Sequence, residues 1–300
     1  MKIKLRLFPA LVISCVATLL VNTISKQNEP TIKNVAENYE IMAVKIPSNL
    51  NLAGERIPIE RQDIRERMDR ELLVNTYWQS NSLLLIKRAH KYFPIIEPLL
   101  DKYGLPDDFK YLALAESGFM NVRSYAGAEG FWQFLKGTAR QYGLEVNNNV
   151  DERYHLEKAT EVAAKYLKNS KKKFGTWTLA AAAYNAGGDR ISRRLKEQHA
   201  SSYFDLFLNE ETSRYVFRIL ALKEIVTNPK KYGFIFKDED LYNPIKYYEV
   251  PVDTAITNIA NFADHFGVTY KKLKLVNPWL RETKLNNKSK KLYMIKIPSK

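Results

Sequence analysis

Cysteine and histidine are scarce in this sequence, and their scarcity excludes two common kinds of site. The 300 residues contain one cysteine, Cys15, so no disulfide can form within the chain. The four histidines lie far apart and match no metal-binding spacing such as HExxH. The sequence therefore predicts neither a metal site nor a cofactor.

A long hydrophobic run is also missing. Mostly apolar residues run from Leu7 to Val21 behind the basic start MKIKLR, but this is shorter than the roughly 20 residues that a membrane-spanning helix needs. A basic start before a short apolar run is typical of an export signal. Residues 1–25 are therefore predicted to be a signal peptide or an N-terminal anchor, and lipidation of Cys15 is a third alternative.

Acidic residues are outnumbered, since 47 lysines and arginines face 33 aspartates and glutamates, for a formal net charge of +14. This balance favours polyanionic partners such as nucleic acid, anionic lipid or cell-wall polymers. No nucleic-acid-binding motif accompanies the charge. The densest basic run, Lys168 to Lys173, is predicted to end a helix, where lysine complements the helix dipole. We therefore expect no nucleic-acid partner.

The periodicity divides the rest of the chain into three parts. Residues 26–60 are polar with scattered prolines and predict a linker whose last part lies over the next domain. Residues 61–235 show helical spacing with few strand signals, so this domain is expected to be mainly α-helical. Within it, Pro94 is predicted to begin a helix that Gly104 ends. In residues 236–300 the helical spacing gives way to a pattern that mixes β-favouring segments with short helical ones.

One stretch, Pro106 to Phe134, contains the clearest functional pattern. Its first half predicts a short helix in which an apolar stripe, extended by one step, reaches Glu116 just before Gly118. Burial and the negative end of the helix dipole both disfavour the charged carboxylate, so the pKa of Glu116 should be raised. A raised pKa is what a general acid at neutral pH requires.

The second half of the stretch reads GFWQF from Gly130 to Phe134. Aromatic rings beside an amide are common in carbohydrate sites, because sugar ring faces stack and hydroxyls need hydrogen bonds. Trp132 and Phe134 could equally pack in the core, and for each ring taken singly the sequence favours core packing over sugar stacking.

Three motifs in order carry a family resemblance: AESGF around Glu116, GFWQF from Gly130, and AYNAG from Ala183 to Gly187. Together they resemble the lytic transglycosylase domain related to goose-type lysozyme, over roughly Leu72 to Val226. The resemblance implies a lysozyme-like, all-helical catalytic domain that acts on peptidoglycan glycan strands.

The resemblance also implies residue roles. Glu116 would protonate the bond between N-acetylmuramic acid and N-acetylglucosamine and then act as a base toward the C6 hydroxyl, leaving a 1,6-anhydro end. The positions that match substrate-binding residues of the family are Ser117, Gln133, Tyr184, Asn185 and Tyr215. Closing the helix is an alternative for Ser117, and core packing is an alternative for Tyr215.

Most glycosidases use two carboxylates, and here only Glu116 lies in a recognisable motif. The other candidates are Glu129, Asp151, Glu152 and Glu211, but no spacing places any of them opposite Glu116. A hydrolytic muramidase that activates water through Glu129 or Asp151 therefore stays open, as does a non-catalytic glycan-binding wall protein.

The last part of the chain has β-favouring residues at Tyr247 to Pro251 and at Leu292 to Pro298, with two short helical patterns between them. This strand, helix, helix, strand order resembles the LysM carbohydrate-binding module, so residues 236–300 are expected to form a small α+β domain. With the export signal, the resemblances imply a bacterial protein of the periplasm or cell envelope, monomeric, with membrane association only through its N-terminus.

Overall fold

The computed structural model describes residues 41–299. The helices and strands of this range all lie in one compact unit that begins at Val44. The predicted signal or anchor, with Cys15, lies outside the described residues. Within them, no helix combines the length and apolar character needed to cross a membrane.

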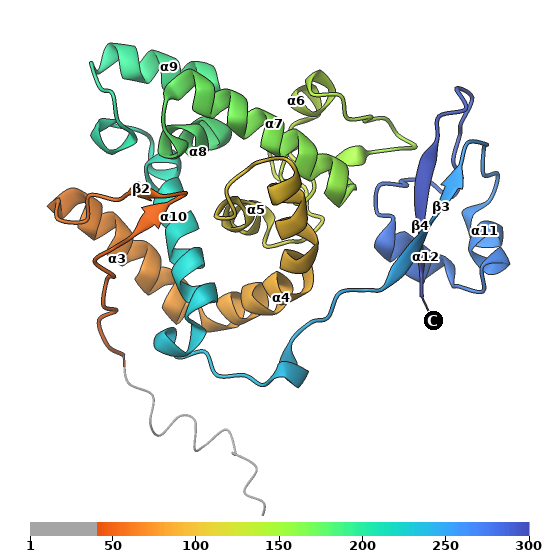
Figure 1. Cartoon of the computed structure of the whole chain (residues 1–300), viewed down its shortest axis with the longest axis horizontal. Helices are drawn as coiled ribbons and strands as arrows, with labels where there is room; N and C mark the ends of the chain where they lie inside the picture. The colour runs from red at the N-terminus through yellow and green to blue at the C-terminus, as the bar shows by residue number, and fades with distance from the viewer. Residues whose placement is uncertain (1–40, 300) are drawn as a thin grey trace, which may run out of the picture. The chain divides into compact units, whose positions relative to one another are not determined.

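Residues 44–235 form a mainly α-helical domain (Figure 1), and the helical character agrees with the prediction made for residues 61–235. Its main helices are α3 (Gln62–Tyr77), α4 (Gln79–Lys102), α5 (Phe109–Ser117), α6 (Lys136–Gln141), α7 (Leu156–Phe174), α8 (Trp177–Ala186), α9 (Gly188–Glu197) and α10 (Glu210–Thr227). Short 3-10 turns connect them: η1 (Glu152–Tyr154), η2 (Tyr203–Asp205) and η3 (Pro229–Tyr232).

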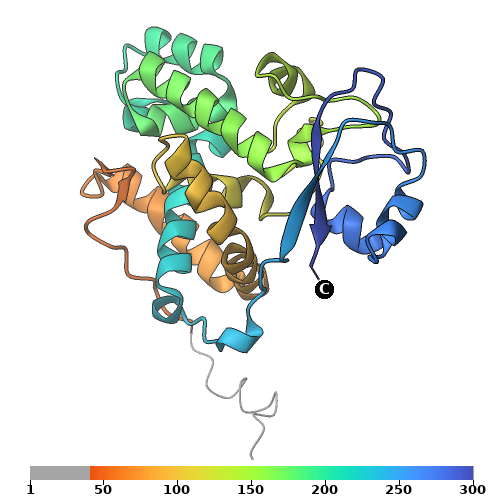
Figure 2. The same cartoon turned by 45° about the vertical axis from the view of Figure 1, so that its right-hand side comes forward.

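Helix α5 lies in the middle of this domain, and Figures 1 and 2 show α4 and α10 beside it. It is buried because its apolar residues are not confined to one side: Phe109, Leu112, Ala113 and Leu114 are all at most 1% exposed. The titratable residue near its C-terminal end, Glu116, is thereby held between helices that are distant in sequence.

Helix α4 corrects one prediction. Pro94 does not begin a helix, because α4 runs without a break from Gln79 to Lys102 with Pro94 and Pro98 inside it. A proline in a helix interior costs about 3 kcal/mol. A buried stripe spans both sides of the prolines and offsets that cost by packing against α5 and α7: Leu85, Ile86, Ala89, Ile96 and Leu100.

Part of the segment predicted as a linker packs against the helical core. Strands β1 (Asn51–Leu52) and β2 (Glu55–Arg56) form a small antiparallel hairpin, and Leu50, Leu52 and Ile57 are buried. The Glu55 carboxylate accepts hydrogen bonds from the first two backbone N–H groups of α8, at 2.6 and 3.0 Å. A carboxylate at a helix N-terminus complements the dipole, so the hairpin helps to fix α8.

The C-terminal domain has the predicted strand, helix, helix, strand order. Strands β3 (Tyr247–Val252) and β4 (Tyr293–Pro298) pair antiparallel, with Tyr247 opposite Pro298. Helices α11 (Ile259–His265) and α12 (Tyr270–Val276) lie between the two strands in sequence. The short turn η4 (Asp238–Asp240) precedes β3. Buried Asn277 joins the end of α12 to β4, because its amide exchanges hydrogen bonds with the backbone N–H and C=O of Lys296.

The two domains make backbone contact along one short edge. Val150 forms an antiparallel bridge with Leu280. On either side, the Asp151 N–H donates to the Trp279 carbonyl and the Arg281 N–H donates to the Asn149 carbonyl, both at 2.9 Å. We call residues 279–281 the docking edge of the C-terminal domain.

Candidate active site

Glu116 lies one residue before the end of α5, where the sequence predicted it. Gly118 ends the helix in the left-handed conformation, at φ 58°, and its N–H donates to the Leu114 carbonyl. A side chain at that position would also meet a Leu85 methyl group at 2.9 Å. Glycine therefore both stops the helix and leaves room for α4, which sets the place of Glu116.

The carboxyl group of Glu116 accepts a hydrogen bond from the hydroxyl of Tyr215 on α10. Burial raises the pKa of Glu116 from 4.5 to about 7, and the nearby charge of Glu211 acts in the same direction. The Tyr215 hydrogen bond and the positive charge of Arg218 oppose this rise without cancelling it. The residue is only partly buried, so a substrate can reach a carboxyl group that is still partly protonated near neutral pH.

Tyr184 on α8 is a second tyrosine in the same electrostatic environment. Burial and the nearby Glu116 charge raise its pKa well above 10, so it stays a neutral donor. Its hydroxyl donates to the Trp132 carbonyl at 2.6 Å, and its ring contacts Phe134. Tyr184 thus joins the AYNAG motif to the GFWQF motif.

Asn185 bridges α8 and the first turn of α10. Its amide oxygen accepts from the Thr212 hydroxyl at 2.9 Å, and its amide nitrogen donates to Glu211 at 3.2 Å. Glu211 is one of the charges that raises the pKa of Glu116. The motif segments that carry Glu116 and Asn185 therefore converge on α10, and Tyr184 links the GFWQF segment to them.

Ser117 has the contacts of a residue that closes a helix. It is buried, and its hydroxyl donates to the Phe131 carbonyl at 2.9 Å and accepts from the Phe119 N–H at 3.1 Å. These bonds attach the end of α5 to the GFWQF segment. Ser117 thus stabilises the helix end next to Glu116 and the loop that it bonds to.

Gln133 lies on a strained turn, with φ 47°. Its amide nitrogen donates to the backbone carbonyls of Gly130 at 2.8 Å and Val122 at 3.1 Å, so the side chain braces its own loop. Trp132 and Phe134 are buried, at 0% and 4% exposure. The Trp132 indole donates to the Thr160 hydroxyl, which identifies this ring as core.

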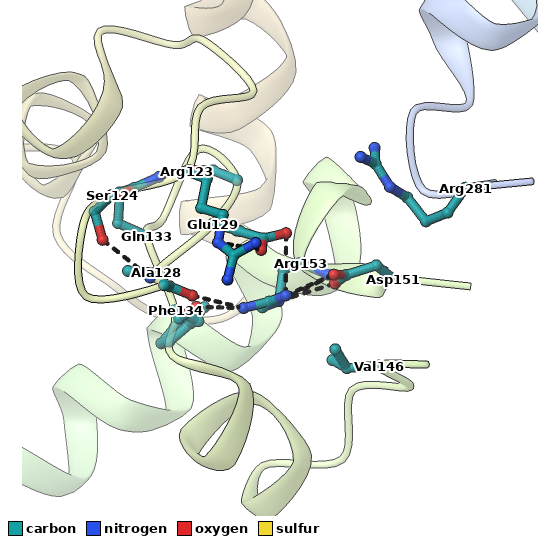
Figure 3. Close-up of polar contacts among 12 residues, drawn as sticks. Arg123, Ser124, Ala128, Glu129, Gln133, Phe134, Val146, Asp151, Arg153 and Arg281 are labelled. Atoms are coloured by element: carbon teal, nitrogen blue, oxygen red, sulfur yellow. Dashed lines mark hydrogen bonds and ion pairs between the residues drawn. The ribbon is translucent and has the colours of Figure 1, made fainter. Parts of the chain in front are cut away.

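Three of the four alternative carboxylates, Glu129, Asp151 and Glu152, pair with cations, and Figure 3 shows the first two beside Arg153. Arg153 lies 3.1 Å from Glu129 and 2.7 Å from Asp151. Glu152 pairs with Lys158 and Lys291. A carboxylate in an ion pair is a poorer base toward water, because the cation stabilises its charged form.

Sequence reasoning missed two arginines. The positive charge of Arg218 lowers the pKa of Glu116. Arg218 follows Tyr215 by about one helical turn of α10, and this spacing could have indicated that both side chains lie on the same face of the helix. Arg153 lies in the segment NVDERY, and nothing local shows that its side chain reaches the loop 20 residues earlier in the chain.

Comparisons with known proteins agree with this arrangement. Residues 94–207 match the family described as the transglycosylase SLT domain, and residues 248–300 match the soluble lytic transglycosylase C-terminal LysM-like domain. Two curated relatives, from Escherichia coli K12 and an O6:H1 strain, are both named membrane-bound lytic murein transglycosylase D. Each is 30% identical over 244 residues, covering 79% of this chain and 52% of the relative. The chain thus spans about half the length of these relatives.

Among solved structures, an inactive mutant of the lytic transglycosylase Slt from Pseudomonas aeruginosa is 24% identical. That alignment covers 51% of this chain and 26% of the other, with a TM-score of 0.39. The 70 kDa soluble lytic transglycosylase of Escherichia coli is 18% identical, covering 54% and 30%, with a TM-score of 0.42.

The two family matches fall on the two domains of the fold. The chain therefore carries a transglycosylase SLT domain followed by a C-terminal LysM-like domain.

Proposed function

We propose that this protein is a peptidoglycan lytic transglycosylase of the bacterial cell envelope, with Glu116 as its general acid and then its base. The observation that carries the proposal is the state of Glu116, whose pKa is raised to about 7 while its carboxyl group is held by Tyr215. The family matches and the murein transglycosylase relatives support the substrate class. The relatives' membrane-bound name and the export-like N-terminus support the location.

In the first step, protonated Glu116 donates its proton to the oxygen between N-acetylmuramic acid and N-acetylglucosamine, and the bond from C1 to that oxygen breaks. In the second step, the Glu116 carboxylate takes the proton of the C6 hydroxyl while its oxygen bonds to C1. The sugar supplies its own nucleophile at a high effective concentration. No second carboxylate is needed, and the acid ends in its starting state.

The other proposed residues hold this geometry. Tyr215 orients the Glu116 carboxyl through its hydroxyl. Tyr184 and Asn185 lie at the end of α8 and bond to the GFWQF segment and to α10. Gln133 braces its loop and Ser117 ties the end of α5 to that loop. Their contacts to N-acetyl groups and sugar hydroxyls are part of the proposal.

The test is to digest purified peptidoglycan with the full chain and weigh the released muropeptides by mass spectrometry. We expect 1,6-anhydro ends, lighter by one water than hydrolysis products. Glu116→Gln should lower the rate by about 10²- to 10⁴-fold, the usual contribution of a proton donor. Glu66→Gln, the same change on the exposed surface of α3, is the control.

Two results would replace the proposal. Products with ordinary reducing ends would make the protein a hydrolytic muramidase. Release by the wild type that does not exceed release by Glu116→Gln would make it a glycan-binding protein without catalysis.

A further inference from the structure

The loop of residues 127–134, here called the Gln133 loop, is held by one buried arginine. Arg153 is 5% exposed, and its Nη1 donates to the carbonyls of Gly127 at 3.1 Å and Phe134 at 3.2 Å. These two carbonyls lie at opposite ends of the loop. Figure 3 shows the guanidinium between the loop and Asp151. One planar, rigid group therefore fixes both ends.

The backbone of Arg153 also presses on the same loop. A Cβ atom built on Gly130 would lie 2.0 Å from the Arg153 carbonyl oxygen. Only glycine permits this approach, and its φ of 81° favours glycine as well. The loop and the Arg153 segment are therefore fitted to each other at backbone level, in addition to the side-chain bonds.

Arg153 is itself held by a carboxylate whose backbone belongs to the domain interface. The side chain of Asp151 accepts from Nε and Nη2 of Arg153, at 3.0 and 2.7 Å. The N–H of the same Asp151 donates to Trp279 on the docking edge. One residue thus links the C-terminal domain to the arginine that fixes the Gln133 loop.

A second path joins the docking edge to the loop. The Arg281 guanidinium lies 4.2 Å from the centre of the Tyr154 ring. A hydrogen bond from Tyr154 to Glu129 contributes, after burial, to raising the pKa of Tyr154 to about 12. Glu129 belongs to the Gln133 loop and also pairs with Arg153.

From these contacts we propose that Arg153 is a positioning residue for the Gln133 loop, and that the docking edge of the LysM-like domain keeps it in place. The C-terminal domain is then a structural part of the substrate site, whether or not it binds glycan itself. The expected effect on substrate binding rests on the proposed function. The expected effect on the rigidity of the Gln133 loop rests on the contacts alone.

The first measurement is backbone amide hydrogen exchange of the Gln133 loop in the full chain. Arg281→Ala changes an exposed side chain and removes its contact with Tyr154 together with its hydrogen bond to the Pro278 carbonyl of the same domain. A cation over an aromatic ring at an exposed site is worth about 0.5–1 kcal/mol, so exchange in the loop should become about two- to fivefold faster. Lys288→Ala, which removes an exposed charge elsewhere in the same domain, should leave it unchanged.

The second measurement separates substrate positioning from chemistry. With soluble glycan strands as substrate, Arg281→Ala should raise KM about two- to fivefold and keep kcat within about twofold. The fall in activity at high pH, which reports the ionisation of Glu116, should stay at the same pH. Arg153→Lys should speed exchange more than Arg281→Ala does, and Arg153→Met more still, since lysine keeps the charge but not the fork.

Equal exchange in Arg281→Ala and Lys288→Ala would overturn the proposal, even if the Arg153 variants fail to fold. Wild-type protein without anhydro products would instead overturn the proposed function, while the exchange data would still decide whether the docking edge holds the loop.

Discussion

Tyr215 and Glu116 are 99 residues apart in sequence, and the hydroxyl of the first donates a hydrogen bond to the carboxyl group of the second. Burial and the Glu116 charge raise the pKa of Tyr215 well above 10, so the phenol remains a donor in both states of its partner. The bond favours the ionised form of Glu116 and therefore moderates the rise in its pKa.

Replacing Tyr215 with phenylalanine should shift the pH profile. Without the hydroxyl the pKa of Glu116 rises further above about 7, because the ionised form loses its hydrogen bond. The alkaline limb of kcat/KM should move to higher pH, since activity needs the protonated acid. The maximum rate should fall about 10- to 150-fold, because a hydrogen bond to a charged group is worth about 1.5–3 kcal/mol and each 1.36 kcal/mol is a factor of about ten in rate.

Tyr184→Phe is the matched control for that measurement, because the Tyr184 hydroxyl donates to the Trp132 carbonyl instead. Its alkaline limb should move less. An alkaline limb that stays in place in Tyr215→Phe would contradict the assignment of that limb to Glu116.

The same carboxyl group should make the protein less stable as pH rises. The pKa of Glu116 is raised from 4.5 to about 7, so the unfolded chain ionises first. Its contribution to stability is complete below about pH 4.5 and is lost as the pH rises through about 7. Glutamine at position 116 cannot ionise, so Glu116→Gln does not lose stability in this way. The free energy of unfolding of the variant minus that of the wild type should therefore rise by about 3 kcal/mol between about pH 4.5 and about pH 7.

Urea denaturation at a series of pH values measures this difference. Glu66→Gln, on an exposed helix surface, should track the wild type. A Glu116→Gln curve parallel to the wild-type curve would mean that Glu116 ionises in the folded protein as it does in water.

Gly130→Ala should destabilise the protein strongly. The new methyl group would collide with the Arg153 carbonyl, and alanine is strained at a φ of 81°. We expect a loss of about 3 kcal/mol or more, the range of overpacked or strained backbone sites. Gly137→Ala in α6 has open space around its Cβ and should gain up to about 1 kcal/mol. Thermal denaturation of the two variants compares them, and equal melting temperatures would contradict the close approach.

The ion pair of Glu157 with Lys296 should stabilise the domain interface. Burial alone would raise the pKa of Glu157, but His155 and Lys296 outweigh it and hold the pKa well below its usual range. Lys296→Met should cost about 2 kcal/mol, less than the ~3–5 kcal/mol of a fully buried pair, because the Glu157 side chain is 24% exposed. This stabilisation should weaken as pH falls, since protonation of Glu157 removes the pair.

The double variant Glu157→Leu with Lys296→Met leaves no unpaired carboxylate and should recover at least half of that loss. The two single variants and the double variant form a thermodynamic cycle in urea. Losses that simply add would show that the two charges do not interact.

Local signals predicted much of this architecture. The apolar spacing of residues 61–235 indicated helices, and the turn at Gly118 placed Glu116 at a helix end, as observed. The prediction at Pro94 was wrong because a buried stripe on both sides of the proline outweighs its local cost. For Trp132 the sequence favoured core packing over stacking, and 0% exposure confirms core packing.

By itself, the sequence determined that Glu116 would lie on a largely buried helix, because helical spacing and a left-handed glycine are properties of neighbouring residues. Tertiary structure alone decided that Tyr215 would hold this carboxyl group and that Arg153 would engage Glu129 and Asp151. It also decided that the LysM-like domain would dock beside that arginine. These pairings join segments far apart in the chain, and no local period specifies which distant hydroxyl or cation a buried carboxylate will meet.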